Sequence, residues 1–449
     1  MKDLRDRGAR GAVPGPEINA GQAVSQDFLR LFYYFGIRLR SKMPPRTPRV
    51  SHDGGARHAA HLRGLNLERV LNVAMDRPGS FTRAELIEAT GLSAPTVGSL
   101  AADLIRSGVV KDLGTGPSSG GRRPFFMELN ARHRYVAGID LGPTRTRLAV
   151  ADLRGARIAD RIVDTPTGVG PAVLLQRIAA ALRTLMREAG APLQRLIVVG
   201  AGAPGAVEWD TGIVSFAPNL KGWSKVPMRD ILEHALGAPV LVENDVNLAV
   251  LGEHWQGAAR GHDTCAFVFV GTGIGAGILL DGVLHRGHSF MAGEIAVMCM
   301  GPQYAETDYG TRGCLETLAG LQALAARWPR GARGDPAEWM AELFKAAEAG
   351  DNAARRAVDE TATLIGIAVA NVAAVLDPSL IVLGGALMAQ GGPLVAEVRK
   401  VVERIAGPPL ELVVSALGKD APLCGCLLVA ATEARKQVRL RLGEARVAK

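Results

Sequence analysis

The sequence contains few aromatic residues, few cysteines and no long hydrophobic run. Aromatic residues make up only 5% of the 449 residues, although hydrophobic residues of all kinds make up 48%, a balance typical of a soluble α/β protein. No uninterrupted apolar run approaches the roughly 20 residues of a membrane-spanning helix. The first twenty residues are charged and rich in glycine and proline, without the apolar core of a signal peptide. We therefore expect a cytoplasmic protein with no membrane contact.

The cysteines are too few and too irregularly spaced for a disulfide framework. There are five of them, an odd number, at positions 265, 299, 314, 424 and 426. We therefore expect reduced thiols.

The charge of the chain is concentrated at its N-terminus. Residues 1–60 hold 11 Lys/Arg against 5 Asp/Glu, whereas residues 61–130 hold 8 against 7. Residues 1–60 are also rich in Gly, Pro, Arg and Ser with little periodicity, so we expect a basic, disordered extension. The chain is too long for one compact core. We divide the remainder into a module at 61–131 and a larger domain at 132–449.

The module begins with two predicted helices. "LNLERVLNVAMD" (65–76) places apolar residues at helical spacing. A second helix follows Thr82, an N-cap candidate with Glu85 three residues later, which is the pattern of a capping box. Gly91 is a natural end for that helix.

A third predicted helix and two strands complete the module. The helix opens with Ser93 as its cap and Pro95 in its first turn, and it runs to Gly108. "VVKDLG" and "PFFMELN" are strand-like and are separated by "TGPSSGGRR". This order is typical of a winged helix-turn-helix, which binds double-stranded DNA.

In such a module the second helix of the pair enters the major groove, and a basic wing contacts phosphates or the minor groove. A small helical domain for protein contacts is the alternative, and the near-neutral charge of the module weighs slightly against DNA. The residues expected to contact DNA are Ser93, Ala94, Thr96, Val97, Ser99, Arg122 and Arg123.

From residue 135 onward, apolar strands that end in glycine alternate with helices. Such strands lead to ligand sites at their ends in α/β folds. Two halves are visible, at about 132–245 together with a C-terminal helix and at 246–430.

Three glycine-rich turns at strand ends could approach phosphate oxygens or a nucleotide closely. They are "GIDLGPTRT", "GTGIGAG" (271–277) and "VLGGAL" (382–387). Asp245 in "ENDVN" ends another strand; a helix cap is the common role for such a residue, and a general base is the alternative that the glycine turns favour. The nucleotide-binding candidates are Asp140, Gly142, Thr144, Gly271, Thr272, Gly273, Gly275, Gly384 and Gly385.

The span 61–435 resembles the ROK family of repressors, open reading frames and sugar kinases, and within it the NagC/XylR-type transcriptional repressors of sugar metabolism. The motifs that carry the resemblance are "RAELIEATGLSAPTVGSLAADLIRSGVV", "GGRRPFFMELN", "GIDLGPT", "GAPGAV", "APNLKGW", "VENDVNLAVLGE", "GTGIGAGI", "AGEI", "GTRGCLE" and "VLGGAL". The resemblance implies two actin-like (ribonuclease H-like) α/β lobes with a central cleft, preceded here by the winged helix-turn-helix.

The resemblance also implies a sugar site. Carboxylates and amides at these positions would accept from and donate to vicinal hydroxyls. In kinase relatives Asp245 would be the catalytic base. The implied sugar-binding residues are Asn244, Asp245, Glu294, Glu316, Pro204, Gly205 and Asn219.

The sequence departs from the family pattern at a zinc site. The family's histidine position is Val297, and two of its cysteine positions are Thr307 and Tyr309. Only Cys314 is kept, and one thiolate cannot build a tetrahedral zinc site. His285, His288 and Cys299 are too loosely spaced to replace the lost ligands. We therefore predict no metal and expect no bound cofactor.

Pro143 is a second departure, because kinases carry glycine there. Proline has no N–H to donate and fixes φ, so the turn should bind a γ-phosphate more weakly, although ATP remains open as a ligand.

We therefore expect a sugar-controlled regulator, a homodimer or tetramer, that represses carbohydrate uptake or catabolism genes. Two alternatives stay open: an ATP-dependent, glucokinase-like sugar kinase with an appended DNA-binding domain, and a degenerate scaffold that binds neither ligand.

Overall fold

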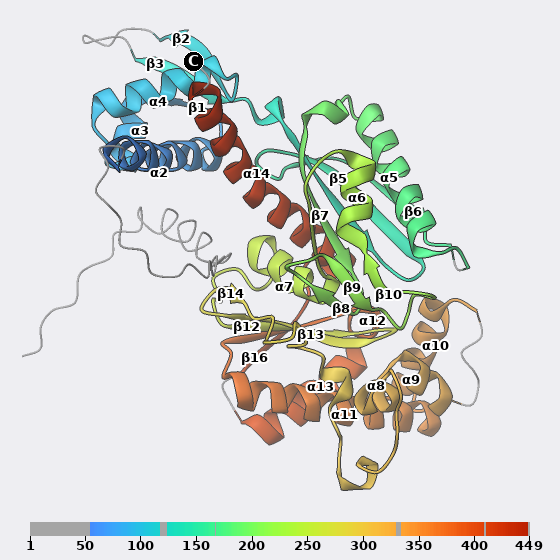
Figure 1. Ribbon diagram of the computed structural model, residues 1–449. Helices are drawn as coiled ribbons and strands as arrows, with labels where there is room; N and C mark the ends of the chain where they lie inside the picture. Colours follow the sequence, from blue (N-terminus) through green and yellow to red (C-terminus); the bar gives the residue numbers. More distant parts are fainter. Residues whose placement is uncertain (1–53, 117–123, 167, 329–333, 408–409, 448–449) are drawn as a thin grey trace, which may run out of the picture. The chain divides into compact units, whose positions relative to one another are not determined.

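The computed structural model describes residues 54–116, 124–166, 168–328, 334–407 and 410–447 (Figure 1). The extension predicted for residues 1–60 lies outside this range up to residue 53. Helix α2 (Gly54–Asp76) includes residues 54–60, so the prediction of disorder is wrong for that stretch. The helix also begins before the expected range of 65–76.

The N-terminal module contains three helices and a three-stranded antiparallel sheet in the order β1-β3-β2. Strand β1 was not predicted from the sequence. It forms because Phe81 pairs with Met127 of β3, and both side chains are buried in the core of the module. Besides α2, the elements are β1 (Ser80–Thr82), α3 (Arg83–Thr90), α4 (Ala94–Arg106), β2 (Val110–Thr115) and β3 (Phe125–Leu129).

The structure confirms the capping residues that the sequence predicted for the helices of the module. The Thr82 side chain accepts from the Glu85 backbone N–H, and the Glu85 carboxylate accepts from the Thr82 N–H at 2.6 Å, which completes the capping box. Gly91 ends α3 with φ of 66°. The Ser93 hydroxyl caps α4 by accepting from the Thr96 N–H.

Two five-stranded sheets repeat one topology. In each, three antiparallel strands that follow one another in sequence are extended by two parallel strands, so the orders are β6-β5-β4-β7-β11 and β14-β13-β12-β15-β16. The first sheet contains β4 (Tyr135–Leu141), β5 (Arg145–Asp152), β6 (Arg157–Asp164), β7 (Leu196–Ala203) and β11 (Val240–Asn244). The second contains β12 (Cys265–Val270), β13 (Ile274–Leu280), β14 (Val283–Leu284), β15 (Leu380–Gly384) and β16 (Glu411–Val414). The run "CAFVFVGTGIGAGILL" forms the β12–β13 hairpin, whose bend lies in the predicted glycine turn.

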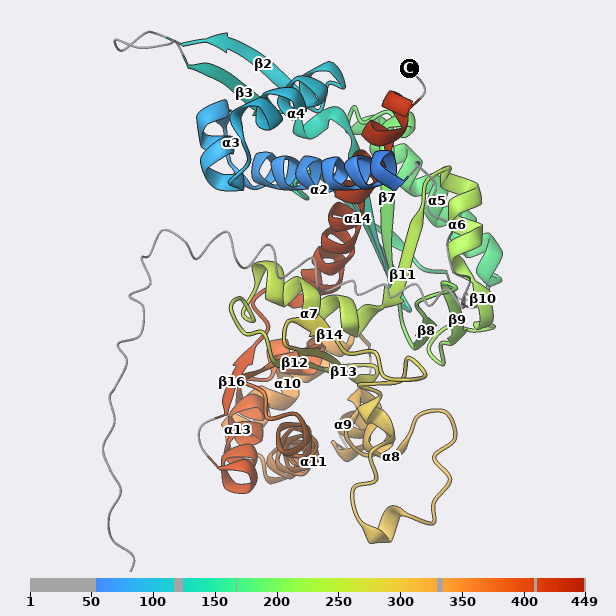
Figure 2. The same cartoon turned by 60° about the vertical axis from the view of Figure 1, so that its left-hand side comes forward.

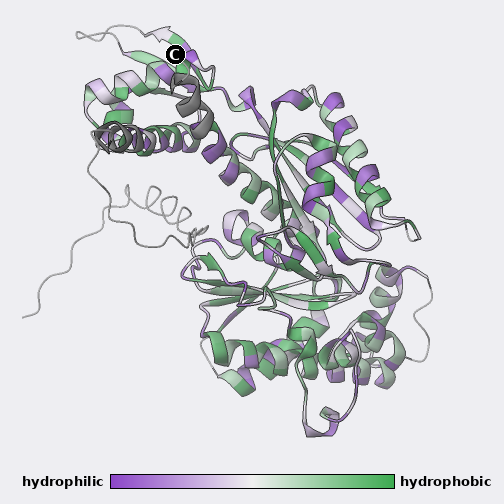
Figure 3. Ribbon diagram, viewed as in Figure 1, coloured by the Kyte–Doolittle hydropathy of each residue, from purple (hydrophilic) through white to green (hydrophobic). Residues whose placement is uncertain are grey.

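Each sheet packs one face against its own set of helices, as expected for an α/β layer, and its central strands are mostly hydrophobic (Figure 3). The first is covered by α5 (Pro171–Glu188) and α6 (Met228–Leu236). Over the second lie α8 (Cys314–Ala319), α9 (Leu321–Arg327), α10 (Pro336–Glu348), α11 (Asn352–Leu376), α12 (Ala386–Gln390) and α13 (Gly392–Ala406). A small antiparallel sheet in the first half contains β8 (Ala206–Glu208), β9 (Ile213–Phe216) and β10 (Ser224–Pro227).

Helices α7 (Asp245–Gln256) and α14 (Ala421–Val447) follow the last strand of each sheet and pack against each other (Figure 2). Helix α7 contacts β12 and β13, and α14 contacts β4 and β7. The two helices can approach closely because each carries a glycine at the crossing. A Cβ on Gly252 would lie 2.2 Å from the Ala421 carbonyl oxygen, and one on Gly425 would lie 2.0 Å from that of Leu248.

Cysteines contribute to this packing as expected for free thiols. All five are unbonded to one another, and Cys424 and Cys426 are buried beside Gly425 on α14. The Cys426 thiol donates to the Ile139 carbonyl of β4 at 3.2 Å. The pair therefore acts as small packing residues.

Among the described residues, one helix is long and apolar enough to cross a membrane, and that helix is α11. Half of its most apolar window is buried inside the protein, in the core over the second sheet. Helices at the core of soluble proteins have the same composition.

Candidate functional site

Asn244 and Asp245 lie where β11 ends and α7 begins. The Asn244 Oδ1 accepts from the backbone N–H groups of Val246 at 2.8 Å and Asn247 at 3.0 Å, and its Nδ2 donates to the Gly205 carbonyl at 2.9 Å. Asn244 is therefore the cap of α7. Asp245 is not the cap, although its Oδ1 also accepts from the Val246 N–H at 2.9 Å.

The turn at Pro204 and Gly205 is held against this pair by a backbone that only glycine accommodates. Gly205 has φ of 81°, and a Cβ there would lie 2.2 Å from the Phe216 carbonyl oxygen. The close approach places the Gly205 carbonyl within reach of the Asn244 amide.

Glu316 and Asn219 approach each other from different halves. Glu316, on α8, accepts from the Ile274 N–H at 3.1 Å through its Oε2. A Cβ on Gly273 would lie 3.3 Å from that oxygen and 3.5 Å from the Asn219 Nδ2. The turn at Gly273 therefore brings an amide of the first half beside a carboxylate of the second.

The site contains four carboxyl groups with raised pKa values: Asp140, Asp245, Glu294 and Glu316. Burial, followed by the charges of Asp140 and Glu294, raises the pKa of Asp245 to about 8. Burial raises the pKa of Asp140 to about 7, with Arg147 opposing the rise and Asp420 adding to it.

The two glutamates show the same tendency. Burial and the charge of Glu316 raise the pKa of Glu294. Burial also raises the pKa of Glu316, while the Ile274 N–H and Arg312 lower it. A carboxyl group with a raised pKa donates to a sugar hydroxyl when protonated and accepts from one when ionised, and an ionised carboxylate could take a proton from a hydroxyl.

The predicted glycine turns occupy equivalent places in the two sheets. The first is the β4–β5 hairpin, where the Gly142 N–H donates to the Arg145 carbonyl at 3.1 Å. The second is the β12–β13 hairpin, where the Gly271 N–H donates to the Gly273 carbonyl at 2.9 Å. These two N–H groups thus close the turns themselves.

Five other nucleotide candidates lie at or near the ends of strands. The side chains of Thr144 and Thr272 are exposed at the two hairpins. Gly385, with φ of 91°, follows Gly384 at the end of β15 and opens α12. Gly275 lies one residue into β13, where a Cβ would be 3.5 Å from the Val246 side chain of α7.

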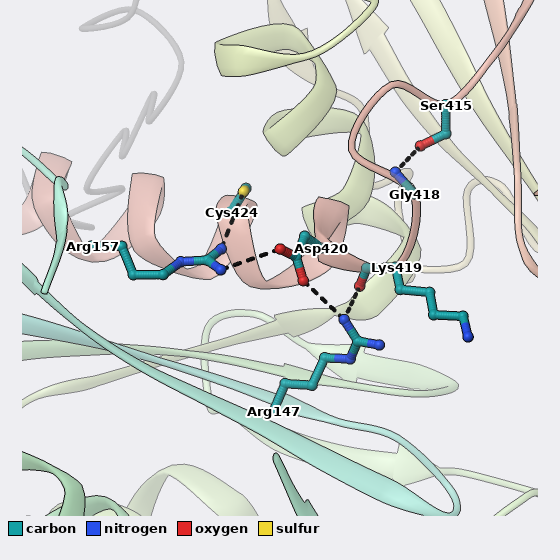
Figure 4. Close-up of polar contacts among 7 residues, drawn as sticks. All are labelled: Arg147, Arg157, Ser415, Gly418, Lys419, Asp420 and Cys424. Atoms are coloured by element: carbon teal, nitrogen blue, oxygen red, sulfur yellow. Dashed lines mark hydrogen bonds and ion pairs between the residues drawn. The ribbon is translucent and has the colours of Figure 1, made fainter. Parts of the chain in front are cut away.

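Arg147 fixes the start of α14 next to the first turn (Figure 4). Its Nη1 donates to the Lys419 carbonyl at 3.0 Å and to Asp420 Oδ1 at 2.9 Å, and Arg157 pairs with Asp420 Oδ2 at 3.2 Å. Arg157 also donates to the Cys424 sulfur at 3.7 Å. Since Arg147 is the register partner of Asp140, the C-terminal helix begins beside the candidate phosphate turn.

The residues at the family's zinc positions do not fit zinc. The Val297 side chain is 66% exposed and carries no ligand atom. Thr307 and Tyr309 carry hydroxyl groups where the family has thiolates, and Cys314 is buried. Within the described ranges, no group of three or more His, Cys, Asp or Glu side chains could hold a metal ion. The absence of zinc stays a prediction.

The proposed DNA contacts differ in their exposure. Ser93 and Ala94 are exposed and Thr96 is partly exposed, but Val97 is buried in the core of the module, so its predicted exposure is wrong. A helical side chain one position after Thr96 points inward because Leu100, Ala101 and Leu104 continue the same apolar face. The Ser99 hydroxyl accepts from Arg63 of α2 at 3.1 Å. Arg122 and Arg123 lie outside the described residues.

Sequence reasoning did not single out Glu243, Arg286 and Trp209. Glu243 is 2% exposed and pairs with the Arg286 Nε at 2.6 Å, and the Arg286 guanidinium lies 4.3 Å from the centre of the Trp209 ring. The available signal was the single carboxylate in the otherwise apolar strand "VLVEN".

Comparison with known proteins agrees with this architecture. The model of the ROK family matches residues 136–433. The xylose repressor of Caldicellulosiruptor bescii is 29% identical over 381 residues, which cover 82% of this chain and 95% of the repressor. The crystal structure of the ROK hexokinase from Thermus thermophilus is 33% identical, with a TM-score of 0.58 over 67% of this chain and 99% of the hexokinase.

A third similar protein shares the fold over a longer part of the chain. It is a ROK family transcriptional regulator described as a homologue of the E. coli MLC protein, with 23% identity and a TM-score of 0.69 over 86% of this chain and all of that regulator. The family match spans both five-stranded sheets and the helices between them. The chain therefore belongs to the ROK family, with its mixed, actin-like α/β fold.

Proposed function

We propose that the protein is a DNA-binding transcriptional repressor of carbohydrate uptake or catabolism genes, controlled by a monosaccharide or sugar phosphate. In this proposal residues 61–131 form a winged helix-turn-helix and residues 132–449 form the effector domain. The protein acts in the cytoplasm as a homodimer or tetramer, without zinc or another cofactor.

The DNA-binding part of the proposal is supported by the helix pair α3–α4. The two helices are separated by a short turn between Gly91 and Ser93, and β2 and β3 follow α4 as a wing would. Ser93, Ala94 and Pro95 are exposed at the start of α4, where a recognition helix contacts base edges. The alignment with the xylose repressor covers 82% of the chain, whereas the hexokinase covers only 67%.

The sugar part is supported by the convergence of amide and carboxyl groups from both halves. The charge of Glu294 in the second half acts on Asp245 in the first, the charge of Glu316 acts on Glu294, and Asn244 directly precedes Asp245. A ligand that bridges the two halves binds more tightly at one separation of the halves than at another. It can shift the equilibrium between these separations only by that difference in affinity. This geometry suits a hydroxyl-rich effector.

Helix α14 connects the two functions, and this observation carries the proposal. Near its start it crosses α7, which begins with Asn244 and Asp245. Near its end it forms ion pairs with α2, between Arg435 and Asp76 at 3.3 Å and between Arg439 and Glu68 at 2.5 Å. A change in the packing of α7 on α14 would therefore reach the DNA-binding module directly.

A sugar kinase is the second candidate, favoured by the pKa of about 8 for Asp245. A base is most effective when its pKa lies near the working pH. Against it stands Pro143, which provides no N–H at the first phosphate turn. Replacing Asp245 with Asn should abolish any phosphorylation while leaving DNA binding intact.

The two candidates are separated by one titration. The DNA fragment upstream of the protein's own gene is shifted by the protein at fixed salt while monosaccharides are added, and ATP consumption is followed in the same samples. Specific binding released by one sugar without ATP consumption supports the repressor. Sugar-dependent ATP consumption without specific DNA binding overturns it in favour of the kinase.

A further inference from the structure

A buried carboxylate precedes the candidate sugar residues. The Glu243 Oε1 accepts from the Asn244 backbone N–H at 2.9 Å and from the Asn247 Nδ2 at 3.0 Å. Its Oε2 accepts from the Arg286 Nε at 2.6 Å. A buried carboxylate is tolerated only when its oxygens are paired in this way. The same pairing fixes the backbone and side chains around the start of α7.

Arg286 comes from the other half of the effector domain. It follows β14 of the second sheet, whereas Glu243 is on β11 of the first. Its guanidinium also stacks over Trp209, which follows β8 in the first half. The side chain is only 16% exposed, so both contacts are made away from bulk water.

The backbone of Arg286 is the base of the loop that leads to Glu294. The Arg286 carbonyl accepts from the Ala292 N–H at 3.1 Å, and the Gly293 carbonyl accepts from the Ala276 N–H of β13 at 2.7 Å. Gly293, with φ of 88°, packs so tightly on Ala276 that a Cβ would lie 1.8 Å from the Ala276 carbonyl oxygen. The loop is therefore fixed at one end to Arg286 and at the other to β13, and the Arg286–Glu243 pair links the half that carries Glu294 to β11.

We propose that Arg286 is a positioning residue that joins the Glu294 loop to Glu243, so that Asn244, Asp245 and Glu294 meet a sugar in one fixed geometry. The inference rests on the proposed sugar site. It adds that the affinity of the site depends on a residue that does not touch the ligand. Because Arg286 contacts two groups of the opposite half, its contacts also favour the separation of the halves in this structure.

Binding of D-xylose and D-glucose by calorimetry tests the first part. Arg286→Met should weaken the binding of whichever sugar the wild type binds by about 10- to 100-fold, since misplacement of binding groups by about 1 Å has effects of this size. Arg286→Lys should recover part of the loss, because the charge remains while the planar stack over Trp209 is lost. Glu243→Gln and Arg286→Met together should weaken binding no more than the larger single change does. DNA binding without sugar should stay within about 2-fold in each variant.

Hydrogen exchange without any ligand tests the second part. Amides of residues 286–297 should exchange faster in Arg286→Met than in the wild type. Arg161→Met is the control, because it removes a surface ion pair with Glu188 of α5 and should leave this loop unchanged. Unchanged exchange of the loop in Arg286→Met, unchanged sugar affinity in that variant, or additive losses in the double variant would each overturn the inference. If the wild type binds neither sugar, the proposed function is weakened, and the exchange of the loop alone decides the role of Arg286.

Discussion

Arg435 of α14 and Asp76 of α2 form an ion pair at 3.3 Å, and only 9% of the Arg435 side chain is exposed. Burial lowers the pKa of Arg435 and raises that of Asp76, while their mutual attraction opposes both shifts. Arg154 of the effector domain adds a bond to the Arg77 carbonyl at 2.7 Å. The end of α2 is therefore fixed to the effector domain by arginines.

Asp76→Asn should loosen this contact and uncouple the sugar response from DNA binding. Removing the charge leaves Arg435 buried with a neutral partner, and the loss should be about 1–3 kcal/mol of unfolding free energy. Sugar affinity should be unchanged, whereas the sugar-induced release of DNA should be several-fold smaller. Glu433→Gln is the matched control, because Glu433 contacts Lys436 and Gln437 of its own helix. Equal sugar responses in the wild type and Asp76→Asn would contradict the role of α14.

Asp245→Asn should stabilise the ligand-free protein at neutral and alkaline pH. The pKa of about 8 in the folded protein lies above the ordinary value of 3.8, so the folded state binds more protons between about pH 4 and pH 8. Stability is therefore lost as the pH rises through this window, and a residue that cannot ionise avoids the loss. The melting temperature of the variant should exceed that of the wild type by a few degrees at pH 8, since about 1 kcal/mol corresponds to about 2–4 °C.

The comparison at low pH is the control for this prediction. Near pH 4 both side chains are uncharged, so the two melting temperatures should converge. A difference that does not vary with pH would mean that Asp245 has an ordinary pKa and that the variant acts through packing.

Chelation should leave the protein unchanged. Zinc cannot be held by Val297, Thr307 and Tyr309 with one thiol, because four ligand atoms are needed. Incubation with EDTA followed by buffer exchange should therefore leave the melting temperature within about 1 °C, well below the 2–4 °C that corresponds to 1 kcal/mol. A marked fall that added zinc reverses would show that ligands outside this cluster bind a structural metal.

Much of the fold follows from sequence because its signals are local. The capping box at Thr82 and Glu85 and the glycine at 91 define α3 without reference to the rest of the chain. The strands β4, β7, β12 and β15 are apolar runs that end in glycine or a polar turn, and the structure has them where expected. Strand β1 was missed because its three residues become a strand only by pairing with β3, which is distant in sequence.

Part of the candidate site could also be predicted, because its glycine turns and strand-end carboxylates are local signals. Asp140, Asp245 and the glycine turns were predicted from strand ends, whereas Glu294 and Glu316 came from the resemblance. In the structure the charges of Asp140 and Glu294 act on Asp245, and that of Glu316 acts on Glu294. The inward direction of Val97 could be predicted from the sequence, because Val97, Leu100, Ala101 and Leu104 are spaced as one apolar helix face. Assigning Val97 to the DNA contacts overlooked this spacing. Arg286 lies 43 positions from Glu243, so no local pattern connects them.

Neutralising the predicted wing should reduce the salt dependence of DNA binding. Arg122 and Arg123 lie outside the described residues, and their role is a prediction from the sequence. If both contact phosphates, replacing them with Ala should weaken DNA binding at all sequences alike. The slope of log affinity against log salt should become shallower by up to about 2, since each contact contributes about 0.9. Unchanged binding would exclude the wing as a phosphate contact.

The measurement that tests the account most directly is fluorescence anisotropy of a labelled upstream DNA fragment, titrated with protein in the presence and absence of the releasing sugar. Wild type should bind the fragment and lose at least about 10-fold in affinity with the sugar, within the usual range of coupling between sites. Glu294→Ala should bind the DNA as the wild type does but lose the response, and the exposed Glu306→Ala should keep it. If the sugar releases DNA equally from Glu294→Ala, or if the wild type binds the fragment no better than unrelated DNA, the proposed repressor with this effector site is wrong.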